Sequence, residues 1–247
     1  MKIVDLLAVD AMVMSLKATV KNEAVHEMVE KLAETGRIND TDVFEAGILA
    51  REAQTSTGLG DGLAMPHAKN KAVVPPTVLF AKTHQGVDYE ALDGQPTYLF
   101  FMIAAPEGAN DTHLQALASL SRLLLNPDLI RDLKKAEKPE EVIALFEEAQ
   151  RVYDEKERVE SLKEVTVAED RPFVIAVTAC PTGIAHTYMA EDALKNKAKE
   201  LGVDIKVETN GSEGIKHALT EEDIKKASGV IIAADKNVEM ARFEGKP

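Results

Sequence analysis

The chain has 247 residues, 45% hydrophobic and 29% charged, which is the composition of a globular protein with a buried core. Its 42 acidic and 29 basic residues give a net charge of −13, so nucleic acid is an unfavourable partner, because that binding depends on Lys and Arg contacts to phosphates. A single cysteine excludes an internal disulfide, and the acidic N-terminus is unlike a secretory signal, so we expect a chain that stays in the reducing cytoplasm.

The first part of the chain mixes predicted helices with predicted strands. Apolar residues at helical spacing predict helices over 21–33 and about 42–53. Residues 77–82 and 97–105 read as strands, and the second is apolar enough to be buried on both faces. Three further helices are expected: a leucine-rich one with a capping-box pattern at its start, and two that begin near prolines (Thr112 with Gln115, Pro127, Pro139). We therefore expect an α/β domain over residues 1–149.

Residues 150–171 differ from their surroundings, because 12 of these 22 residues are charged and few are apolar. Pro172 follows and disfavours helix in the residue before it. We interpret the segment as an interdomain linker whose first half can be helical. The alternative is a solvated helix that belongs to the first domain.

Residues 172–247 alternate regularly between strands and helices. The expected order is strand, helix, strand, helix, strand (173–179, about 185–201, 205–209, 220–227, 229–234). This alternation predicts a parallel sheet with helices on its faces. The chain ends about thirteen residues after the third strand, so we expect this domain to be incomplete at its C-terminus.

A glycine-rich loop precedes His67 in the first domain, in "STGLGDGLAMPHAK". The spacing G-x-G-x-G after a predicted helix does not fit a dinucleotide-binding turn, which follows a strand. We expect instead a turn whose main-chain N–H groups approach an anion beside His67. A neutral imidazole is a competent phosphoryl acceptor, and His113 and Arg51 could hydrogen-bond the phosphoryl oxygens. A zinc site with two histidines is the alternative, although no third ligand stands at useful spacing.

Cys180 ends the first strand of the second domain, where open parallel sheets carry their chemistry. The residues after it form a loop and the start of a helix (Pro181, Thr182, Gly183, Ile184, Ala185, His186, Thr187). Backbone N–H groups and the positive end of that helix would stabilise a thiolate, and they would also hold a phosphoryl group. The alternative is a buried structural cysteine.

The spacing between Cys180 and His186 matches the Cys-x5-Arg loop of phosphotyrosine-type phosphatases, but histidine stands in place of the arginine that clamps phosphate. The loop is therefore better suited to passing a phosphoryl group on than to hydrolysing it. A cysteine-dependent phosphatase or reductase remains an alternative.

Both loops resemble parts of the bacterial phosphoenolpyruvate-dependent phosphotransferase system. The segments "REAQTSTGLGDGLAMPH" and "PEGANDTHLQALASLSRLL" resemble enzyme IIA of the fructose/mannitol family, whose fold is a mixed sheet flanked by helices. "VTACPTGIAHTYMAEDAL" with "VETNGSEGI" resembles the enzyme IIB domain of fructose-family permeases. The resemblance implies that His67, through Nε2, and Cys180 carry phosphoryl groups, with His113 and Arg51 stabilising the first of them.

The resemblance further implies a relay that needs no metal and no cofactor. The phosphocarrier protein HPr would phosphorylate His67, His67 would pass the group to Cys180, and Cys180 would give it to a sugar. Fructose, giving fructose 1-phosphate, is the expected sugar, and mannitol or a mannosyl derivative is the alternative. The sugar would be delivered by a membrane-embedded enzyme IIC that would bring the chain to the inner face of the membrane. A regulatory phosphoprotein of the nitrogen-regulation type, which moves no sugar, is the alternative.

Overall fold

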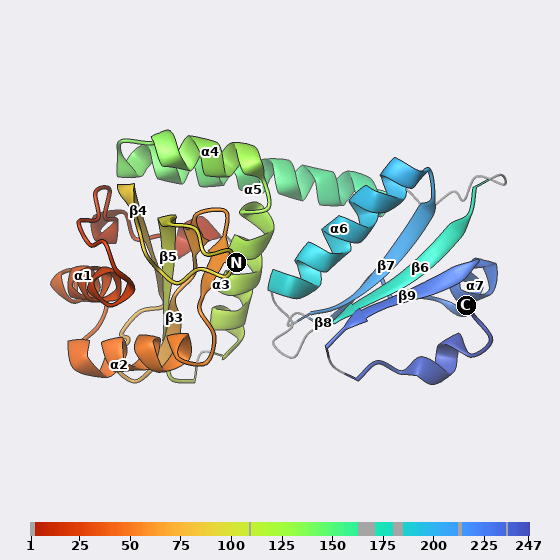
Figure 1. Cartoon of the computed structure of the whole chain (residues 1–247), viewed down its shortest axis with the longest axis horizontal. Coiled ribbons are helices and arrows are strands. Elements are labelled where there is room, and N and C mark those ends of the chain that lie inside the picture. The colour runs from red at the N-terminus through yellow and green to blue at the C-terminus, as the bar shows by residue number, and fades with distance from the viewer. Residues whose placement is uncertain (1–2, 109, 163–170, 180–184, 212–213, 236) are drawn as a thin grey trace. The chain divides into compact units, whose positions relative to one another are not determined.

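A computed structural model describes residues 3–108, 110–162, 171–179, 185–211, 214–235 and 237–247 (Figure 1). Residues 1–119 and 126–151 form one compact unit, and residues 120–125 and 152–247 form a second. Both units combine helices with a sheet, which confirms the predicted α/β class. None of the helices in the described ranges is both long enough and apolar enough to cross a membrane.

The sheet of the first unit is built around β5 (Thr97–Pro106). One side of β5 pairs antiparallel with β4 (Thr77–Val87). The other side pairs parallel with two short strands in succession, β2 (Leu63–Ala64) and β3 (His67–Asn70), and β1 (Gly58–Gly60) pairs antiparallel with β2. The sheet is therefore mixed, and β5 is its central strand.

Side chains of β5 are buried on both faces, as its apolar sequence predicts. Phe100 and Met102 belong to a core that also includes residues of α1 (Lys21–Glu34) and α2 (Thr41–Glu52). Phe101 points to the opposite face, where its ring lies 5.8 Å from that of Phe146 in an edge-on arrangement. Figure 1 shows α1 and α2 on one side of this sheet and α3 (Asn110–Leu123) on the other.

Local signals in the sequence fix several ends of these helices. The Asp40 carboxylate accepts a hydrogen bond from the Val43 N–H and caps α2. Asn126 caps α4 (Pro127–Lys135) in the same way, and prolines begin both α4 and α5 (Pro139–Leu162), as expected. The predicted start of α3 at Thr112 is wrong, because the helix begins at Asn110 and Thr112 lies inside its first turn rather than at its N-cap.

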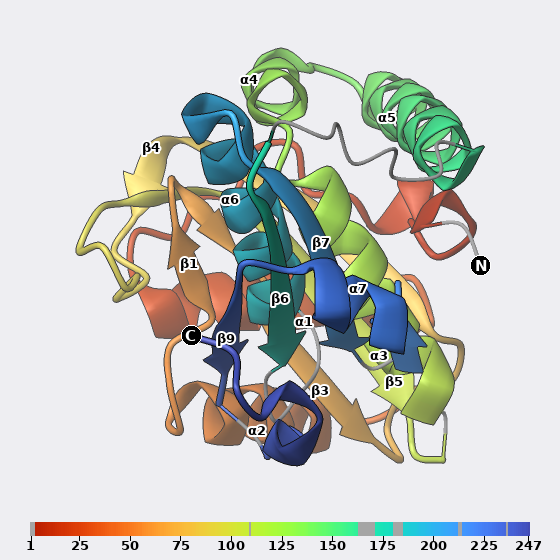
Figure 2. The same cartoon turned by 90° about the vertical axis from the view of Figure 1, so that its right-hand side faces the viewer.

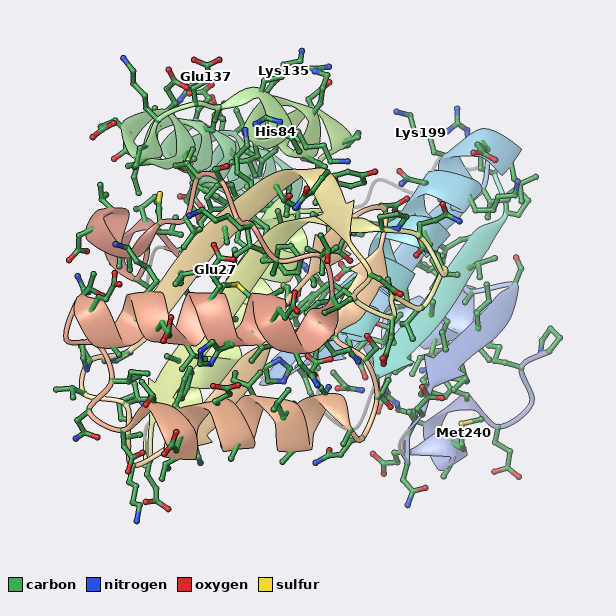
Figure 3. All side chains as sticks on the ribbon, turned by 60° about the vertical axis from the view of Figure 1, so that its left-hand side comes forward. Glu27, His84, Lys135, Glu137, Lys199 and Met240 are labelled. Carbon is green, nitrogen blue, oxygen red and sulfur yellow. The ribbon has the colours of Figure 1, made fainter. Side chains whose placement is uncertain are left out.

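The N-terminal segment runs along the free edge of β4 and includes two short 3-10 helices, η1 (Ile3–Asp5) and η2 (Val9–Ala11). Glu27 of α1, labelled in Figure 3, accepts hydrogen bonds from the backbone N–H groups of Lys17 and Ala18 and so holds this segment.

The buried ammonium of Lys82 on β4 donates to the carbonyls of Lys134 and Ala136 at the end of α4.

The second unit contains a four-stranded sheet in the order β8-β7-β6-β9. Its parallel strands are the three expected ones, β6 (Phe173–Ala179), β7 (Asp204–Gly211) and β9 (Gly229–Ala234). The short antiparallel β8 (Gly214–Lys216) was not expected. Figure 2 shows α6 (Ala185–Leu201) and α7 (Glu221–Lys226) on opposite faces of this sheet.

Alternation along β6 sends Phe173, Ile175 and Val177 to the face covered by α7. The 3-10 helix η3 (Met240–Phe243) adds Phe243 to the same core. The predicted linker begins inside α5, which continues to Leu162, and residues 163–170 lie outside the described part of the chain.

Candidate functional site

His67 lies where strand pairing along β5 is interrupted and then resumes. β2 ends at Ala64, and β3 begins at His67, which is in register with Ile103. Pro66 occupies the gap, where its missing N–H is not needed by the sheet, and its carbonyl accepts a hydrogen bond from the Ile103 N–H at 2.9 Å. Backbone pairing with β5 on both sides of Pro66, by β2 before it and by β3 after it, thus fixes the position of His67.

The glycine-rich segment before His67 is a tight hairpin between β1 and β2. Gly60, Asp61 and Gly62 have positive φ values of 96°, 53° and 78°, which explains two of the three glycines. The Asp93 carboxylate accepts a hydrogen bond from the Asp61 N–H at 3.0 Å and holds the hairpin tip. These glycines therefore shape a hairpin, which agrees with rejecting a dinucleotide-binding turn.

Two hydrogen bonds define the tautomer of His67. Its Nδ1 lies 2.8 Å from the carbonyl oxygen of Met65, and a carbonyl can only accept, so Nδ1 carries the proton. Arg51 Nε lies 3.2 Å from His67 Nε2, and a guanidinium can only donate, so Nε2 offers its lone pair. The geometry selects the neutral imidazole whose nucleophilic nitrogen is Nε2.

The electrostatic surroundings of His67 also favour the neutral ring. Burial is the main cause that lowers the pKa of His67 below its ordinary value of 6.5, and the positive charge of Arg51 lowers it further. The hydrogen bond to the Met65 carbonyl and the negative charge of Glu52 oppose this shift. The lowered pKa thus favours the same neutral form of the ring that the two hydrogen bonds select.

Arg51 reaches His67 from the last turn of α2. Besides donating to His67 Nε2, its Nη1 donates to the carbonyl of Thr55 at 3.0 Å, just beyond the end of the helix. The predicted pairing of Arg51 with His67 in space is thus present in the structure. A guanidinium fork at this position can hydrogen-bond two oxygens of a phosphoryl group bound at Nε2.

The next residue, Glu52, is a buried carboxylate that the sequence reading missed. Its side chain is 3% exposed and accepts hydrogen bonds from the N–H and the hydroxyl of Thr57 and from the Tyr89 hydroxyl. Lys21 Nζ lies 4.0 Å from it. No sequence signal marked these residues, because a glutamate at a helix end is usually solvated and Tyr89 stands 37 residues away.

The other predicted site residues are described only in part. His113 lies in the first turn of α3, and nothing is described of its side chain. Cys180 and the loop residues Pro181, Thr182, Gly183 and Ile184 lie outside the described residues. Ala185, His186 and Thr187 open α6, and Thr187 is buried. The last residue of β6, Ala179, is in register with Asn210 of β7 and Ala234 of β9.

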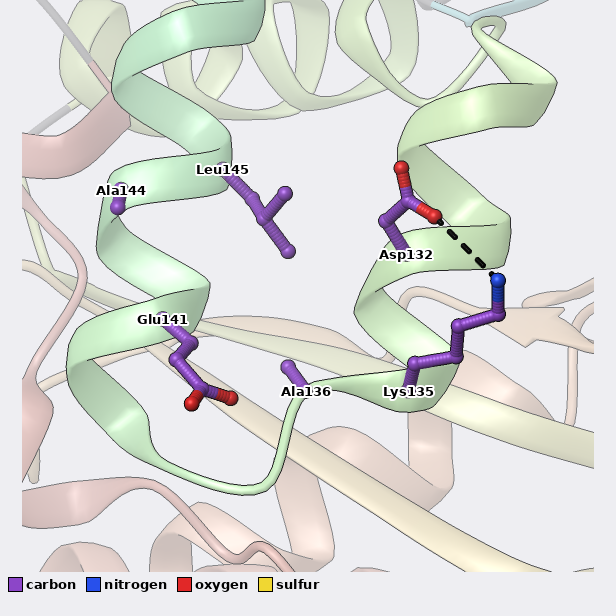
Figure 4. A pocket seen from close by; sticks show the side chains of 6 residues that line it. All are labelled: Asp132, Lys135, Ala136, Glu141, Ala144 and Leu145. Carbon is purple, nitrogen blue, oxygen red and sulfur yellow. Dashed lines mark ion pairs between the residues drawn. The ribbon is translucent and has the colours of Figure 1, made fainter.

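Other features of the described residues do not join this site. A hollow of about 420 Å³ lies between α4 and α5, and the side chains that line it include Ala144 and Leu145. Asp132 and Lys135, which also line it, form a 3.9 Å ion pair (Figure 4). His84, labelled in Figure 3, is exposed on β4. Within the described ranges, no three His, Cys, Asp or Glu side chains gather as metal ligands would.

Comparison with protein families supports the reading of both units. Residues 5–149 match the model for "Phosphoenolpyruvate-dependent sugar phosphotransferase system, EIIA 2". Residues 175–247 match the model for "PTS system, Lactose/Cellobiose specific IIB subunit". The resemblance stated from the two sequence loops is therefore confirmed at the level of the family.

Individual relatives agree with these matches. The chain is 49% identical, over 246 residues, to the fructose-specific EIIABC component of Bacillus subtilis, covering 100% of this chain and 38% of that protein. It is 32% identical to the 2-O-alpha-mannosyl-D-glycerate-specific EIIABC component of Escherichia coli, covering 96% and 35%. The crystal structure of nitrogen regulatory protein IIA-Ntr from Neisseria meningitidis is 29% identical with a TM-score of 0.55, covering 58% of this chain and 98% of that one. The chain thus spans little more than a third of the length of the two EIIABC relatives.

Proposed function

The chain belongs to the EIIA 2 family of the phosphoenolpyruvate-dependent sugar phosphotransferase system, and from this premise we propose that it is a phosphotransferase that relays a phosphoryl group from His67 to Cys180. One observation carries the proposal: His67 is held as a neutral imidazole with its Nε2 lone pair beside an arginine. We assign residues 1–149 to the IIA domain, residues 150–171 to the linker and residues 172–247 to the IIB domain.

In the first step, the Nε2 lone pair attacks the phosphorus of a phosphohistidine on the carrier protein HPr. The new N–P bond forms as the donor's N–P bond breaks, and the electron pair of the broken bond returns to the donor nitrogen. His67 needs no proton transfer, because Nε2 is already unprotonated. Positioning and charge stabilisation carry most of the catalysis in such transfers, and Arg51 supplies a fixed positive charge.

In the second step, the Cys180 thiolate attacks the same phosphorus. An S–P bond forms while the N–P bond breaks, which returns His67 to its neutral form. The strand order supports this role, because Cys180 follows the end of β6, flanked by β7 and β9. The N-terminus of α6, which begins at Ala185, would turn the positive end of a helix toward a phosphoryl group on Cys180.

In the last step, a sugar hydroxyl oxygen attacks the phosphorus, the S–P bond breaks to regenerate the thiolate, and the hydroxyl proton leaves to a base. We propose fructose as the sugar, because the relative with 49% identity is described as fructose-specific. A membrane-embedded IIC component would present the sugar and would place this chain at the cytoplasmic face of the membrane. His113 would add a hydrogen bond to the phosphoryl group on His67.

Incubation of the chain with phosphoenolpyruvate, enzyme I and HPr, followed by mapping of the phosphorylated residues, tests the proposal. We expect label on His67 and on Cys180. The His67→Ala variant should lose both labels, whereas Cys180→Ser should retain label on His67. Label on Cys180 in the His67→Ala protein would contradict the proposed order of transfer.

A second candidate function is regulatory, because the first unit shares its fold with a nitrogen regulatory protein. Such a protein would accept phosphate on His67 and move no sugar. Sugar uptake in cells that carry Cys180→Ser distinguishes the two functions. Loss of uptake supports the relay, and unchanged uptake supports the regulatory function.

A further inference from the structure

Glu52 is an ionisable group buried beneath the His67 site. The residue is 6% exposed, although a buried charge is costly unless hydrogen bonds and opposite charge compensate it. Three donors supply that compensation: the Thr57 N–H at 3.0 Å, the Thr57 hydroxyl, and the Tyr89 hydroxyl at 3.1 Å. The Lys21 ammonium lies 4.0 Å away and pairs more closely with Glu90 at 2.5 Å. Through these contacts the Glu52 carboxylate holds Thr57 and Tyr89 in place.

Hydrogen bonds and the backbones of Thr57 and Met65 connect Glu52 to the His67 imidazole. Thr57 donates to Glu52 through both its N–H and its hydroxyl, while its carbonyl accepts a hydrogen bond from the Met65 N–H at 3.0 Å. The carbonyl of Met65 in turn accepts the proton of His67 Nδ1 at 2.8 Å. The N–H and the carbonyl of Thr57 flank one Cα, as do those of Met65, so Glu52 acts by position: it fixes Thr57, which sets the Met65 backbone and the carbonyl that holds the His67 ring.

We infer that Glu52 is a positioning residue, which acts through Thr57 and Met65 to hold His67 in the Nδ1–H tautomer with Nε2 directed at the phosphoryl donor. The inference rests on the proposed function of His67, and it adds to it the group that sets the acceptor nitrogen. Glu52 touches neither His67 nor a phosphoryl group, so it is not a catalytic residue.

The charges that face His67 fit this role. Arg51 from the end of α2 and Glu52 from the same turn act in opposite directions on the pKa of His67, with Arg51 lowering it and Glu52 raising it. Lys21 at the start of α1 partly offsets Glu52. Tyr89 stays a neutral hydrogen-bond donor, because burial, reinforced by Glu52, raises the pKa of its hydroxyl far above neutral pH.

The Glu52→Gln variant tests the inference, because it removes the charge and keeps the shape. Nitrogen NMR of the histidine ring reports the tautomer and the pKa of His67, and the initial rate of transfer from phosphorylated HPr reports its reactivity. We expect a measurable fraction of the Nε2–H tautomer, a further lowering of the His67 pKa, and a transfer rate reduced about tenfold, the scale of one hydrogen bond to a charged group. A purely structural role for Glu52 would lower stability and leave the tautomer and the pKa of the folded protein unchanged.

Glu208→Gln is the matched control, since Glu208 is a buried glutamate of the second unit, 1% exposed. It should leave the tautomer of His67 and the rate of its phosphorylation unchanged. Should Glu52→Gln fail to fold, Thr57→Val and Tyr89→Phe each remove one donor to Glu52 and decide the question by smaller changes in the same direction.

A folded Glu52→Gln protein with the wild-type tautomer, pKa and rate would overturn the inference, as would wild-type behaviour of both smaller variants. Failure of the proposed function is recognised separately. In that case HPr leaves the wild-type His67 unlabelled, while the NMR measurements still report the effect of Glu52 on the ring.

Discussion

Replacing Arg51 with methionine tests what the guanidinium beside His67 does. Arg51 Nε donates to His67 Nε2 at 3.2 Å, which is the nitrogen that would form the bond to phosphorus. This hydrogen bond must break when Nε2 attacks, and the guanidinium is then free to bind the phosphoryl oxygens. Arg51 should therefore stabilise the resting ring slightly and the phosphorylated ring of the proposed relay strongly, because a phosphoryl group carries close to two negative charges.

The size of the effect follows from the hydrogen bonds exchanged. A hydrogen bond to a charged group contributes about 1.5–3 kcal/mol, which corresponds to a rate change of roughly 10- to 150-fold. Arg51 is half-buried, so water replaces part of its contribution, and the neutral bond to Nε2 is lost at the same time. We therefore expect Arg51→Met to slow phosphorylation of His67 about tenfold, at the lower end of this range.

Rapid-quench measurement of label transfer from phosphorylated HPr gives the rate, and NMR titration gives the pKa of His67. The pKa should rise in Arg51→Met, because the Arg51 charge lowers it. Arg51→Lys, which keeps the charge but lacks the planar fork, should be intermediate in rate. A rate for Arg51→Met equal to or faster than that of the wild type would refute the reasoning, since it would mean that the guanidinium only masks the nucleophile.

Two further predictions concern pH and stability. The pKa of His67 in the folded protein lies below the unfolded value of 6.5, so the unfolded chain binds more protons than the folded chain as the pH falls below 6.5. The free energy of unfolding should therefore decrease on acidification more in the wild type than in His67→Gln. Urea titrations between pH 8 and 5 that show a constant difference in this free energy between the two proteins would contradict the prediction. Arg242→Leu should destabilise the second unit by about 3 kcal/mol, because it strips the buried Glu208 carboxylate of its paired guanidinium. The exposed ion pairs of Arg131 make Arg131→Leu the control, expected to cost at most about 1 kcal/mol; equal losses in urea unfolding would show that burial does not decide the outcome.

The long elements of the fold were predictable from sequence because each carries its own periodicity. The apolar run of β5 and the three parallel strands of the second unit were found with nearly their observed bounds, whereas the short antiparallel β8 was missed. The strands next to His67 were missed, since β1, β2 and β3 have three, two and four residues, too few to show alternation. β2 and β3 form because the side of β5 opposite β4 has backbone groups that need hydrogen-bond partners, and this pairing arises only when the sheet assembles.

The residues of the candidate site also fall into those that local sequence indicated and those that only tertiary contacts reveal. His67 and Arg51 were identified because their local sequence resembles a known family, and the structure brings them within hydrogen-bond distance. Glu52 was missed, because its role depends on contacts with Thr57 and Tyr89 that arise only when the end of α2 packs beside the segment after β4. Sequence shows which residue types are present, but a solvated charge and a buried one are distinguished only by their tertiary contacts.

Two hydrogen bonds of His67, one at each ring nitrogen, would behave differently during the proposed turnover. The bond from Nδ1 to the Met65 carbonyl involves a nitrogen that does not react, so it can persist before and after phosphorylation. The bond from Arg51 to Nε2 involves the reacting nitrogen and must change partner. A cycle of accepting and donating a phosphoryl group would therefore require the Arg51 side chain to move, while the bond to the Met65 carbonyl keeps the ring in its orientation. A relay benefits from this arrangement, since an acceptor that does not reorient has less reorganisation to complete in either direction of transfer.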